Sequence, residues 1–175
     1  MLKTLRKIAS VGLVSEPAPQ PDEPLRIRSA LDEQIRSVLG RALCIRHVDA
    51  GSCNGCELEI HALNNPIYNL EGIGIRFVAS PRHADLLLVT GPVAVNMETA
   101  LRRVYEATPD PKLVVAIGDC GCTGGIFGES GPSRGRISNV IPVDVAVPGC
   151  PPSPARILAG IMTAIANSRG ATTGG

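Results

Sequence analysis

The chain has 175 residues, enough for one domain with a buried core, and its shares of hydrophobic (44%) and charged (19%) residues are typical of a globular protein. A net charge of +1, with no Trp, two Phe and two Tyr, argues against a nucleic-acid partner, because neither a basic surface nor stacking side chains are available. No apolar stretch reaches the roughly 18 residues of a membrane helix, and no convincing secretory signal is present. We therefore expect a cytoplasmic protein whose six cysteines are metal ligands or buried thiols rather than disulfides.

Residues 1–40 are predicted to form an extension that precedes the main domain. Residues 1–14 have the spacing of an amphipathic helix, with apolar side chains on one face and basic side chains largely elsewhere. Residues 15–24 contain four prolines and three acids and are predicted to be an extended linker, and residues 25–40 have helical spacing that ends at Gly40. The first helix has the features of a membrane-surface segment, although a simple contact with another subunit explains the pattern equally well.

Short apolar runs alternate with helical stretches across residues 41–168. Strands are predicted at Ala42–Val48, Ile73–Ala79, Leu86–Thr90, Leu113–Ile117 and Val143–Val147. Helices are predicted at Glu57–Leu63, Met97–Ala107 and Pro154–Asn167. Strands that alternate with helices predict an α/β fold, in which a parallel sheet has helices on both faces. Residues 169–175 are small and polar, and we expect a flexible tail.

Three of the predicted strands lead directly into cysteines. The first strand is followed by Cys53 and Cys56, the fourth by Cys120 and the fifth by Cys150. In an open parallel sheet, the loops at the carboxyl ends of the strands meet at one edge, where ligands bind. We therefore expect the four thiols to converge from distant parts of the chain. Glycines beside each cysteine would let backbone N–H groups approach the sulfurs.

One C-x-x-C pair with two distant single cysteines suits either an iron–sulfur cluster or tetrahedral zinc. Structural zinc sites usually use two close pairs, so this spacing favours the cluster over zinc. Buried thiols that bind no metal are the third alternative. A thioredoxin-like redox pair explains the sequence less well, because it leaves Cys120 and Cys150 without a role.

Four motifs occur in an order that resembles a known family. They are D-x-G-S-C-N-G-C-E at Asp49–Glu57, P-R-H-A-D at Pro81–Asp85, G-D-C-G-C-T-G-G-I-F at Gly118–Phe127 and I-P-V-D-V-x-V-P-G-C-P-P at Ile141–Pro152. They are similar to the small subunit of membrane-bound, energy-converting nickel–iron hydrogenases of the formate hydrogenlyase type. That family is similar in turn to the 20-kDa cluster subunit of NADH:quinone oxidoreductase (respiratory complex I). The resemblance covers residues 41–166.

The resemblance implies that Cys53, Cys56, Cys120 and Cys150 are the ligands of one 4Fe-4S cluster. It implies a flavodoxin-like fold and an oxidoreductase subunit that transfers electrons, while the catalytic site lies in another chain. The implied partners are the nickel–iron hydrogenase large subunit or its complex I counterpart, a ferredoxin-like iron–sulfur subunit and membrane subunits. We expect a peripheral protein on the cytoplasmic face of the membrane, without a transmembrane helix of its own.

Cysteine spacing separates the related classes. The first motif contains Cys53-x-x-Cys56, whereas complex I subunits have two adjacent cysteines there. Unlike the periplasmic uptake hydrogenases, the chain has no twin-arginine signal, since Arg102-Arg103 is internal, and it has too few cysteines for three clusters. The energy-converting hydrogenase type is therefore favoured. A complex I-like quinone oxidoreductase subunit and, less well supported, a zinc-stabilised structural domain are the alternatives.

Two further cysteines and one histidine are expected to have structural roles. Cys44 lies within the first predicted strand, where a thiol is ordinarily a small buried hydrophobe. Cys122 follows Cys120 by two residues, at a position where the family usually has another residue type. His61 shares a predicted helical face with Glu57, which is only a weak metal-binding pattern.

Four charged residues near the motifs each have two interpretations. Glu57 and Asp119 adjoin cysteines, where a carboxylate would lower the potential of a cluster or couple electron transfer to proton transfer. An acid at a helix start or in a loop is the simpler interpretation. Arg82 and His83 precede the third predicted strand, where cations would pair with a partner subunit, stabilise a reduced cluster or simply lie in a solvated turn.

Overall fold

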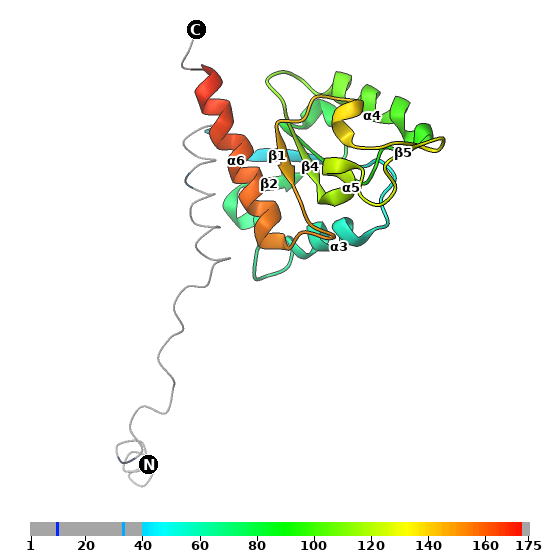
Figure 1. Ribbon diagram of the computed structural model, residues 1–175. Helices are drawn as coiled ribbons and strands as arrows, with labels where there is room; N and C mark the ends of the chain where they lie inside the picture. Colours follow the sequence, from blue (N-terminus) through cyan, green and yellow to red (C-terminus); the bar gives the residue numbers. More distant parts are fainter. Residues whose placement is uncertain (1–9, 11–32, 34–39, 173–175) are drawn as a thin grey trace.

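The computed structural model describes Ser10, Glu33 and residues 40–172, with the side chains of residues 169–172 left out (Figure 1). Apart from Ser10, Glu33 and Gly40, the predicted N-terminal helices and the proline-rich linker lie outside the described residues. Figure 1 shows helices packed on both sides of a central sheet.

Five parallel strands form the central sheet in the order β2-β1-β3-β4-β7. They are β1 (Leu43–Asp49), β2 (Ile75–Phe77), β3 (Leu86–Thr90), β4 (Leu113–Ile117) and β7 (Val145–Val147). This is the strand order of flavodoxin-like folds, so the α/β fold predicted from the sequence is confirmed. All residues of the central strand β3 are buried, which is what a continuous apolar run predicts for a strand covered on both faces.

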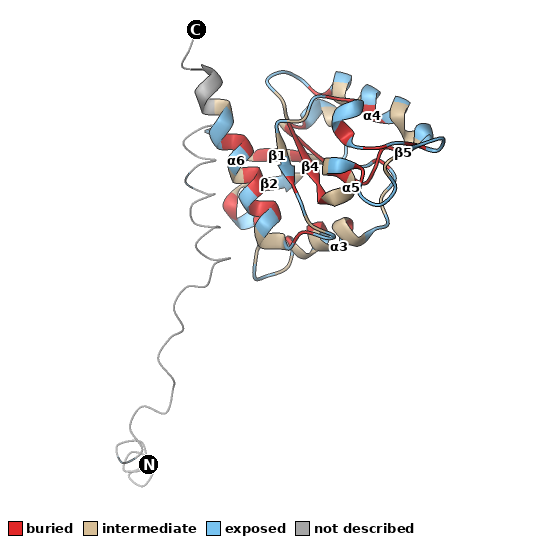
Figure 2. Cartoon of the chain, in the orientation of Figure 1, coloured by how far each residue is buried: buried red, intermediate tan, exposed pale blue. Residues whose placement is uncertain are grey.

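Helices cover both faces of the sheet. They are α3 (Gly55–Ala62), α4 (Val95–Ala107), α5 (Gly118–Thr123) and α6 (Pro154–Thr172). On one face, Ile60 of α3 and Ile157 of α6 join the core cluster that includes Leu88. On the other face, Leu101 of α4 joins a second cluster that includes Leu87. Buried residues follow the sheet and the inner side of α6 in Figure 2, in agreement with the two core clusters.

Element boundaries differ from the predictions at a few places. β2 is shorter than predicted because Ile73 belongs to the 3-10 helix η1 (Leu70–Ile73), which comes directly before the strand. α6 is described as far as Thr172, beyond its predicted end at Asn167. None of the helices in the described part of the chain is long and apolar enough to cross a membrane.

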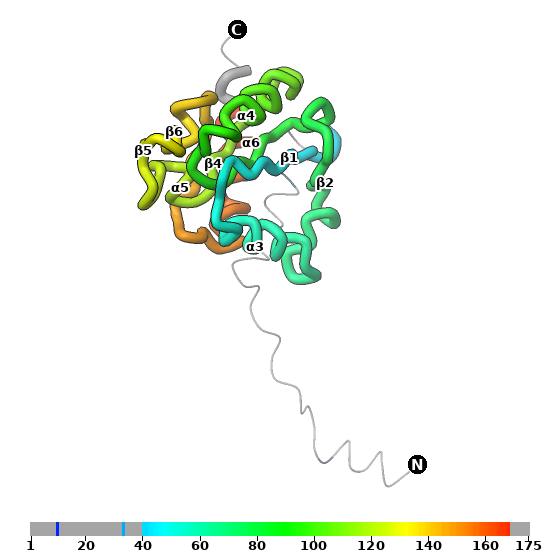
Figure 3. The backbone as a smooth tube through the Cα atoms, turned by 90° about the vertical axis from the view of Figure 1, so that its right-hand side faces the viewer, coloured from blue at the N-terminus to red at the C-terminus, as the bar shows by residue number. Residues whose placement is uncertain are grey.

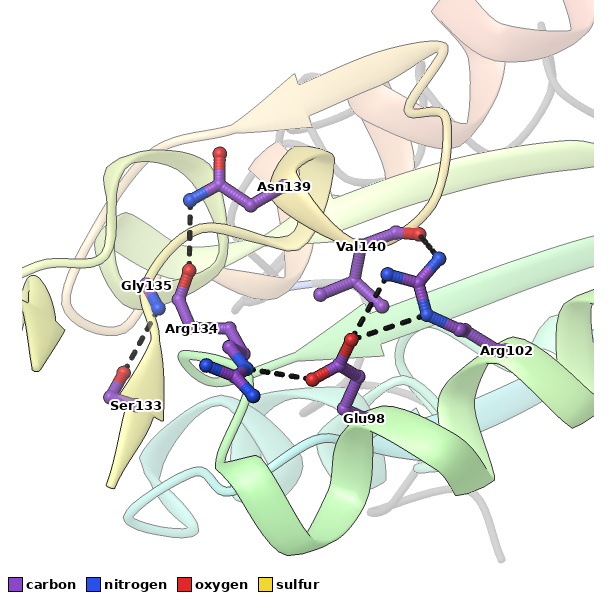
Figure 4. Close-up of polar contacts among 7 residues, drawn as sticks. All are labelled: Glu98, Arg102, Ser133, Arg134, Gly135, Asn139 and Val140. Carbon is purple, nitrogen blue, oxygen red and sulfur yellow. Dashed lines mark hydrogen bonds and ion pairs between the residues drawn. The ribbon is translucent and has the colours of Figure 1, made fainter. Parts of the chain in front are cut away.

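A small antiparallel hairpin, β5 (Glu129–Ser130) and β6 (Ser133–Arg134), is not predicted by any sequence pattern. Glu98 of α4 fastens this hairpin, because its carboxylate accepts hydrogen bonds from Nε of Arg134 (2.7 Å) and from Nη2 of Arg102 (3.0 Å) (Figure 4). The same two bonds hold the pKa of Glu98 below its ordinary value, that of Arg134 most strongly. In Figure 3 the hairpin lies on the side of the molecule opposite β2. The network anchors the long connection between β4 and β7 to α4.

Candidate metal centre

The loops after β1, β4 and β7 leave the sheet at its carboxyl-terminal edge and carry the cysteines of interest. Cys56 lies in the first turn of α3 and Cys120 lies in α5, whereas Cys53 and Cys150 lie in loops. β1 pairs with β3, β3 with β4 and β4 with β7, so the three loops start from nearby positions on one edge. The topology therefore brings together segments that are far apart in the sequence.

The four thiols lie close enough to interact electrostatically. The pKa of Cys56 is raised to about 12, first by burial and then by the negative charges of Glu57 and of the other three cysteine thiolates. Burial also raises the pKa of Cys120, with smaller contributions from Cys150 and Cys53. Four thiolates in one region repel one another, and a bound cationic centre would relieve that repulsion.

Glycines pack directly against two of the sulfurs. A Cβ atom on Gly118 would lie 2.6 Å from Sγ of Cys56 and 3.4 Å from the carbonyl oxygen of Gly149, and Gly118 has a positive φ of 84°. A Cβ atom on Gly125 would lie 2.9 Å from Sγ of Cys120. Since a real Cβ does not approach atoms below 3.0 Å, both positions need glycine. The three loops therefore form a cradle of backbone and sulfur in which Gly118 and Gly125 leave no room for a side chain.

Side-chain hydrogen bonds shape the first loop. Oδ1 of Asp49 accepts the N–H groups of Gly51 and Ser52 at 2.8 Å each, and Oγ of Ser52 accepts the N–H of Asn54 at 3.1 Å. Asn54 then adopts a left-handed φ of 72° as the N-cap of α3, a conformation that Asn accepts more readily than most residues. This turn leaves one cysteine in the loop and places the next in the first turn of the helix.

The site opens at the protein surface. Cys53 and Cys150 are exposed, whereas Cys56 and Cys120 are half-buried. The exposed large hydrophobic residues of the described chain all occur in the segments that follow β1, β3 and β4: Leu58, Ile67, Val95, Ile126 and Phe127. Where such residues form a contiguous patch, they are typical of a surface that another protein covers.

Cys44 and Cys122 pack away from the four thiols. Sγ of Cys122 lies 3.7 Å from the carbonyl oxygen of Ala116, within the hydrophobic cluster under α4, and burial raises its pKa to about 11. Cys44 is half-buried in the amino-terminal half of β1, where its backbone N–H donates to Asp85. Both environments are those of structural thiols, as expected from their positions in the sequence.

Arg82 and His83 lie at the opposite edge of the sheet. They belong to the 3-10 helix η2 (Pro81–His83), which precedes β3. The length of that strand therefore separates them from the carboxyl-terminal edge of the sheet, where the four cysteines lie. The interpretation of these residues as cations that stabilise a reduced cluster is therefore wrong. They instead line a cavity of about 460 Å³ beside the ion pair of Arg41 and Asp85.

Glu57 is buried next to Cys56 and faces a histidine that no sequence motif indicated. Glu57 is only 6% exposed, and neither carboxylate oxygen has a hydrogen-bond partner in the described part of the chain. Nε2 of His47 lies 3.6 Å from Oε1 of Glu57 and 3.1 Å from Oγ1 of Thr90. Burial lowers the pKa of His47, and the charge of Glu57 offsets part of that shift.

His47 also lines a cavity of about 240 Å³ together with His61. The histidine that faces the carboxylate of Glu57 in the structure is thus His47 from β1, and not His61 of its own helix. A histidine inside a strand has no spacing signal, so the sequence pattern could not identify it. Only the unusual burial of a glutamate would have suggested that a partner was needed.

A flavodoxin-like sheet that gathers thiols at the carboxyl ends of its strands is an architecture suited to an oxidoreductase subunit. The comparison with protein families agrees with this class. The family model described as NADH ubiquinone oxidoreductase, 20 Kd subunit, matches residues 53–164, and the chain belongs to this family. The matched region begins at Cys53 and contains Cys56, Cys120 and Cys150.

Similar curated proteins are subunits of hydrogenases and of NADH-quinone oxidoreductases. The chain is 49% identical over 132 residues to the probable membrane-bound hydrogenase subunit mbhJ of Pyrococcus furiosus, covering 75% of this chain and 79% of the relative. It is 40% identical over 154 residues to formate hydrogenlyase subunit 7 of Escherichia coli, covering 84% of this chain and 60% of the relative. It is 42% identical over 124 residues to a subunit of the NADH-quinone oxidoreductase of Desulfovibrio desulfuricans, covering 70% of this chain and 66% of the relative.

A solved structure is also similar. A chain in the structure of the membrane-bound sulfane sulfur reductase, an archaeal respiratory membrane complex, superimposes with a TM-score of 0.62 and 34% identity, covering 83% of this chain and 77% of that chain. These findings confirm the resemblance predicted from the four motifs. The protein is an oxidoreductase subunit.

Proposed function

We propose that this chain is the electron-transfer subunit of a membrane-bound, energy-converting nickel–iron hydrogenase, and that it holds one 4Fe-4S cluster on Cys53, Cys56, Cys120 and Cys150. The observation that supports this most directly is the meeting of these four thiols in one glycine-lined cradle. A bound cluster would supply one-electron chemistry. The chain's own residues would hold it, exclude bulky groups from the sulfurs and leave one side open to a partner.

The donor set suits a cluster better than zinc. No three or more His, Cys, Asp or Glu side chains within residues 40–168 are placed so that one metal ion would fit among them. One C-x-x-C pair with two distant single cysteines favours a cluster over structural zinc, which usually uses two close pairs.

The cofactor proposal is tested on the complex purified under anaerobic conditions. About four irons and four sulfides per chain are expected, with a half-spin electron paramagnetic resonance signal after reduction by dithionite. Replacing any one of Cys53, Cys56, Cys120 and Cys150 by Ala should remove that signal. Cys122→Ser is the matched control, because this thiol also lies in α5 but packs into the core. Stoichiometric zinc without iron would contradict the proposal.

Two observations favour the hydrogenase class over the quinone-reducing class. The first motif has the spacing Cys53-x-x-Cys56, and identity to the hydrogenase relative (49% over 132 residues) exceeds that to the NADH-quinone oxidoreductase relative (42% over 124 residues). A complex I-like quinone oxidoreductase subunit is the second candidate, favoured by the family description. The similar structure is named for a third reaction, sulfane sulfur reduction, so we infer that the partner chain determines the reaction.

The sequence of the large subunit and one assay separate the two candidates. For a hydrogenase we expect a partner with two C-x-x-C pairs that bind nickel and iron, and a complex that evolves hydrogen from reduced methyl viologen. A partner without these cysteines, in a complex that reduces quinone and evolves no hydrogen, would assign the chain to the second candidate. The cluster proposal would be unaffected by that result.

We further propose a peripheral position on the cytoplasmic face of the membrane. The large subunit would cover exposed apolar residues of the segments that follow β1, β3 and β4, and a ferredoxin-like subunit and membrane subunits would complete the complex. The names of the relatives support a multisubunit membrane complex. Deletion of residues 1–14 should weaken association with membrane fractions while the cluster is retained. Sedimentation that matches the full chain would exclude this segment as an anchor.

A further inference from the structure

Two hydrogen bonds join the residues that immediately precede Cys120 and Cys150. The N–H of Asp119 donates to the carbonyl oxygen of Gly149 at 2.8 Å, and the N–H of Gly149 donates to Oδ1 of Asp119 at 2.8 Å. Each residue is therefore both donor and acceptor for the other. This pair of bonds, the Asp119 clamp, closes a ring between the loop after β4 and the loop after β7.

Both partners of the Asp119 clamp have little freedom to move. Gly149 has a positive φ of 143°, and a Cβ atom there would lie 2.7 Å from Cα of Pro152. Asp119 is half-buried at the start of α5, where its own carbonyl oxygen accepts a hydrogen bond from Oγ1 of Thr123 at 2.9 Å. The clamp thus joins two constrained backbone segments rather than two mobile loops.

We propose that Asp119 is a positioning residue that fixes the spacing of Cys120 and Cys150, and that it does so through its acceptor oxygen rather than its charge. The inference rests on the proposed function of these cysteines as cluster ligands. Oδ1 of Asp119 is the atom that accepts the N–H of Gly149, and an amide oxygen can take the same place. An uncharged acceptor of the same shape would therefore keep this hydrogen bond.

The fold contains a matched control for this clamp. The N–H of Asp144 donates to the carbonyl oxygen of Val114 at 2.9 Å, and the N–H of Val114 donates to Oδ2 of Asp144 at 2.7 Å. The geometry repeats that of the Asp119 clamp at the opposite end of the same pair of strands, β4 and β7. Asp144→Ala therefore removes an equivalent bond between the same elements, far from the cysteine loops.

The experiment compares Asp119→Ala, Asp119→Asn and Asp144→Ala in the intact complex. Release of iron to a chelator should be roughly tenfold faster or more in Asp119→Ala, because the N–H of Gly149 loses its hydrogen-bond acceptor. Asp119→Asn keeps the acceptor, so its release rate should match the wild type. Asp144→Ala should lower thermal stability without changing the release rate. Both Asp119 variants lose the charge, so both should raise the reduction potential by a similar amount.

Three results would overturn the inference. Iron release from Asp119→Asn as fast as from Asp119→Ala would show that the charge is required rather than the oxygen. Equally fast release from Asp144→Ala would show general destabilisation. An unchanged rate in Asp119→Ala would show that the clamp is not needed. A wild-type complex without iron would instead refute the proposed function, and the inference would fail with it.

Discussion

Gly118→Ala is the substitution whose effect the structure specifies most closely. A residue with a Cβ costs about 1–2 kcal/mol in the left-handed conformation that Gly118 adopts. The added methyl would lie 2.6 Å from Sγ of Cys56, so that sulfur or the loop must move, at a cost of about 1–3 kcal/mol. We expect the free energy of unfolding to fall by about 2–5 kcal/mol and cluster iron to be lost.

The matched control is Gly128→Ala. Gly128 also has a positive φ, of 53°, but no atom lies within 4 Å of the position that its Cβ would take. It should therefore show the conformational cost alone, about 1–2 kcal/mol, with full iron content. Denaturant unfolding of the purified full chain and iron analysis of the complex measure the two effects. If Gly118→Ala keeps its iron and is no less stable than Gly128→Ala, the proposed contact with the sulfur of Cys56 is not real.

Three further substitutions test other parts of the fold. Gly160→Ala would place a methyl group against Val147, so the free energy of unfolding should fall by about 1–3 kcal/mol. An unchanged denaturation midpoint would mean that α6 does not pack closely on β7. Burial lowers the pKa of His47 in the folded chain, so the free energy of unfolding should decrease as the pH falls below the ordinary pKa of 6.5. His47→Gln should reduce this pH dependence, which unfolding curves at a series of pH values would measure. The pKa of Glu98 is lowered mainly by Arg134, so its contribution to stability is present above pH 4.5 and is lost as the pH falls through the lowered pKa; Glu98→Gln should remove this acid-dependent part, and high salt should diminish it.

Sequence patterns predicted the interior of the fold better than its periphery. β3 and β4 have the predicted bounds because both are continuous apolar runs that are buried on two faces. α5 was not predicted, since a short Gly- and Cys-rich segment has no helical periodicity. The β5–β6 hairpin was missed for a different reason: its residues are mostly exposed, and a distant side chain, Glu98, holds it in place.

The candidate site also has features that the sequence predicted and features that it did not. Spacing and strand order predicted that the loops with Cys53, Cys56, Cys120 and Cys150 share one edge of the sheet, because parallel strands present their carboxyl ends together, and the strand pairing agrees. Their role as ligands stays a prediction. The partners of the acidic residues could not be predicted. Asp119 binds a backbone N–H in another loop, a contact that depends on the exact approach of two strand ends.

The distribution of the four thiols over three loops also has a consequence for the stability of the chain. A group bound by all of them would act as a cross-link that encloses β2, β3 and β4 in one closed loop and β5, β6 and β7 in a second. Like a disulfide, such a link would reduce the conformational entropy of the unfolded chain, by an amount worth on the order of 3–5 kcal/mol for loops of this length. Oxidative loss of the cluster would then weaken the folded state as well as interrupt electron flow. Damaged copies of the protein would unfold more often and become substrates for proteolysis, so that redox damage and protein turnover would be coupled in one event.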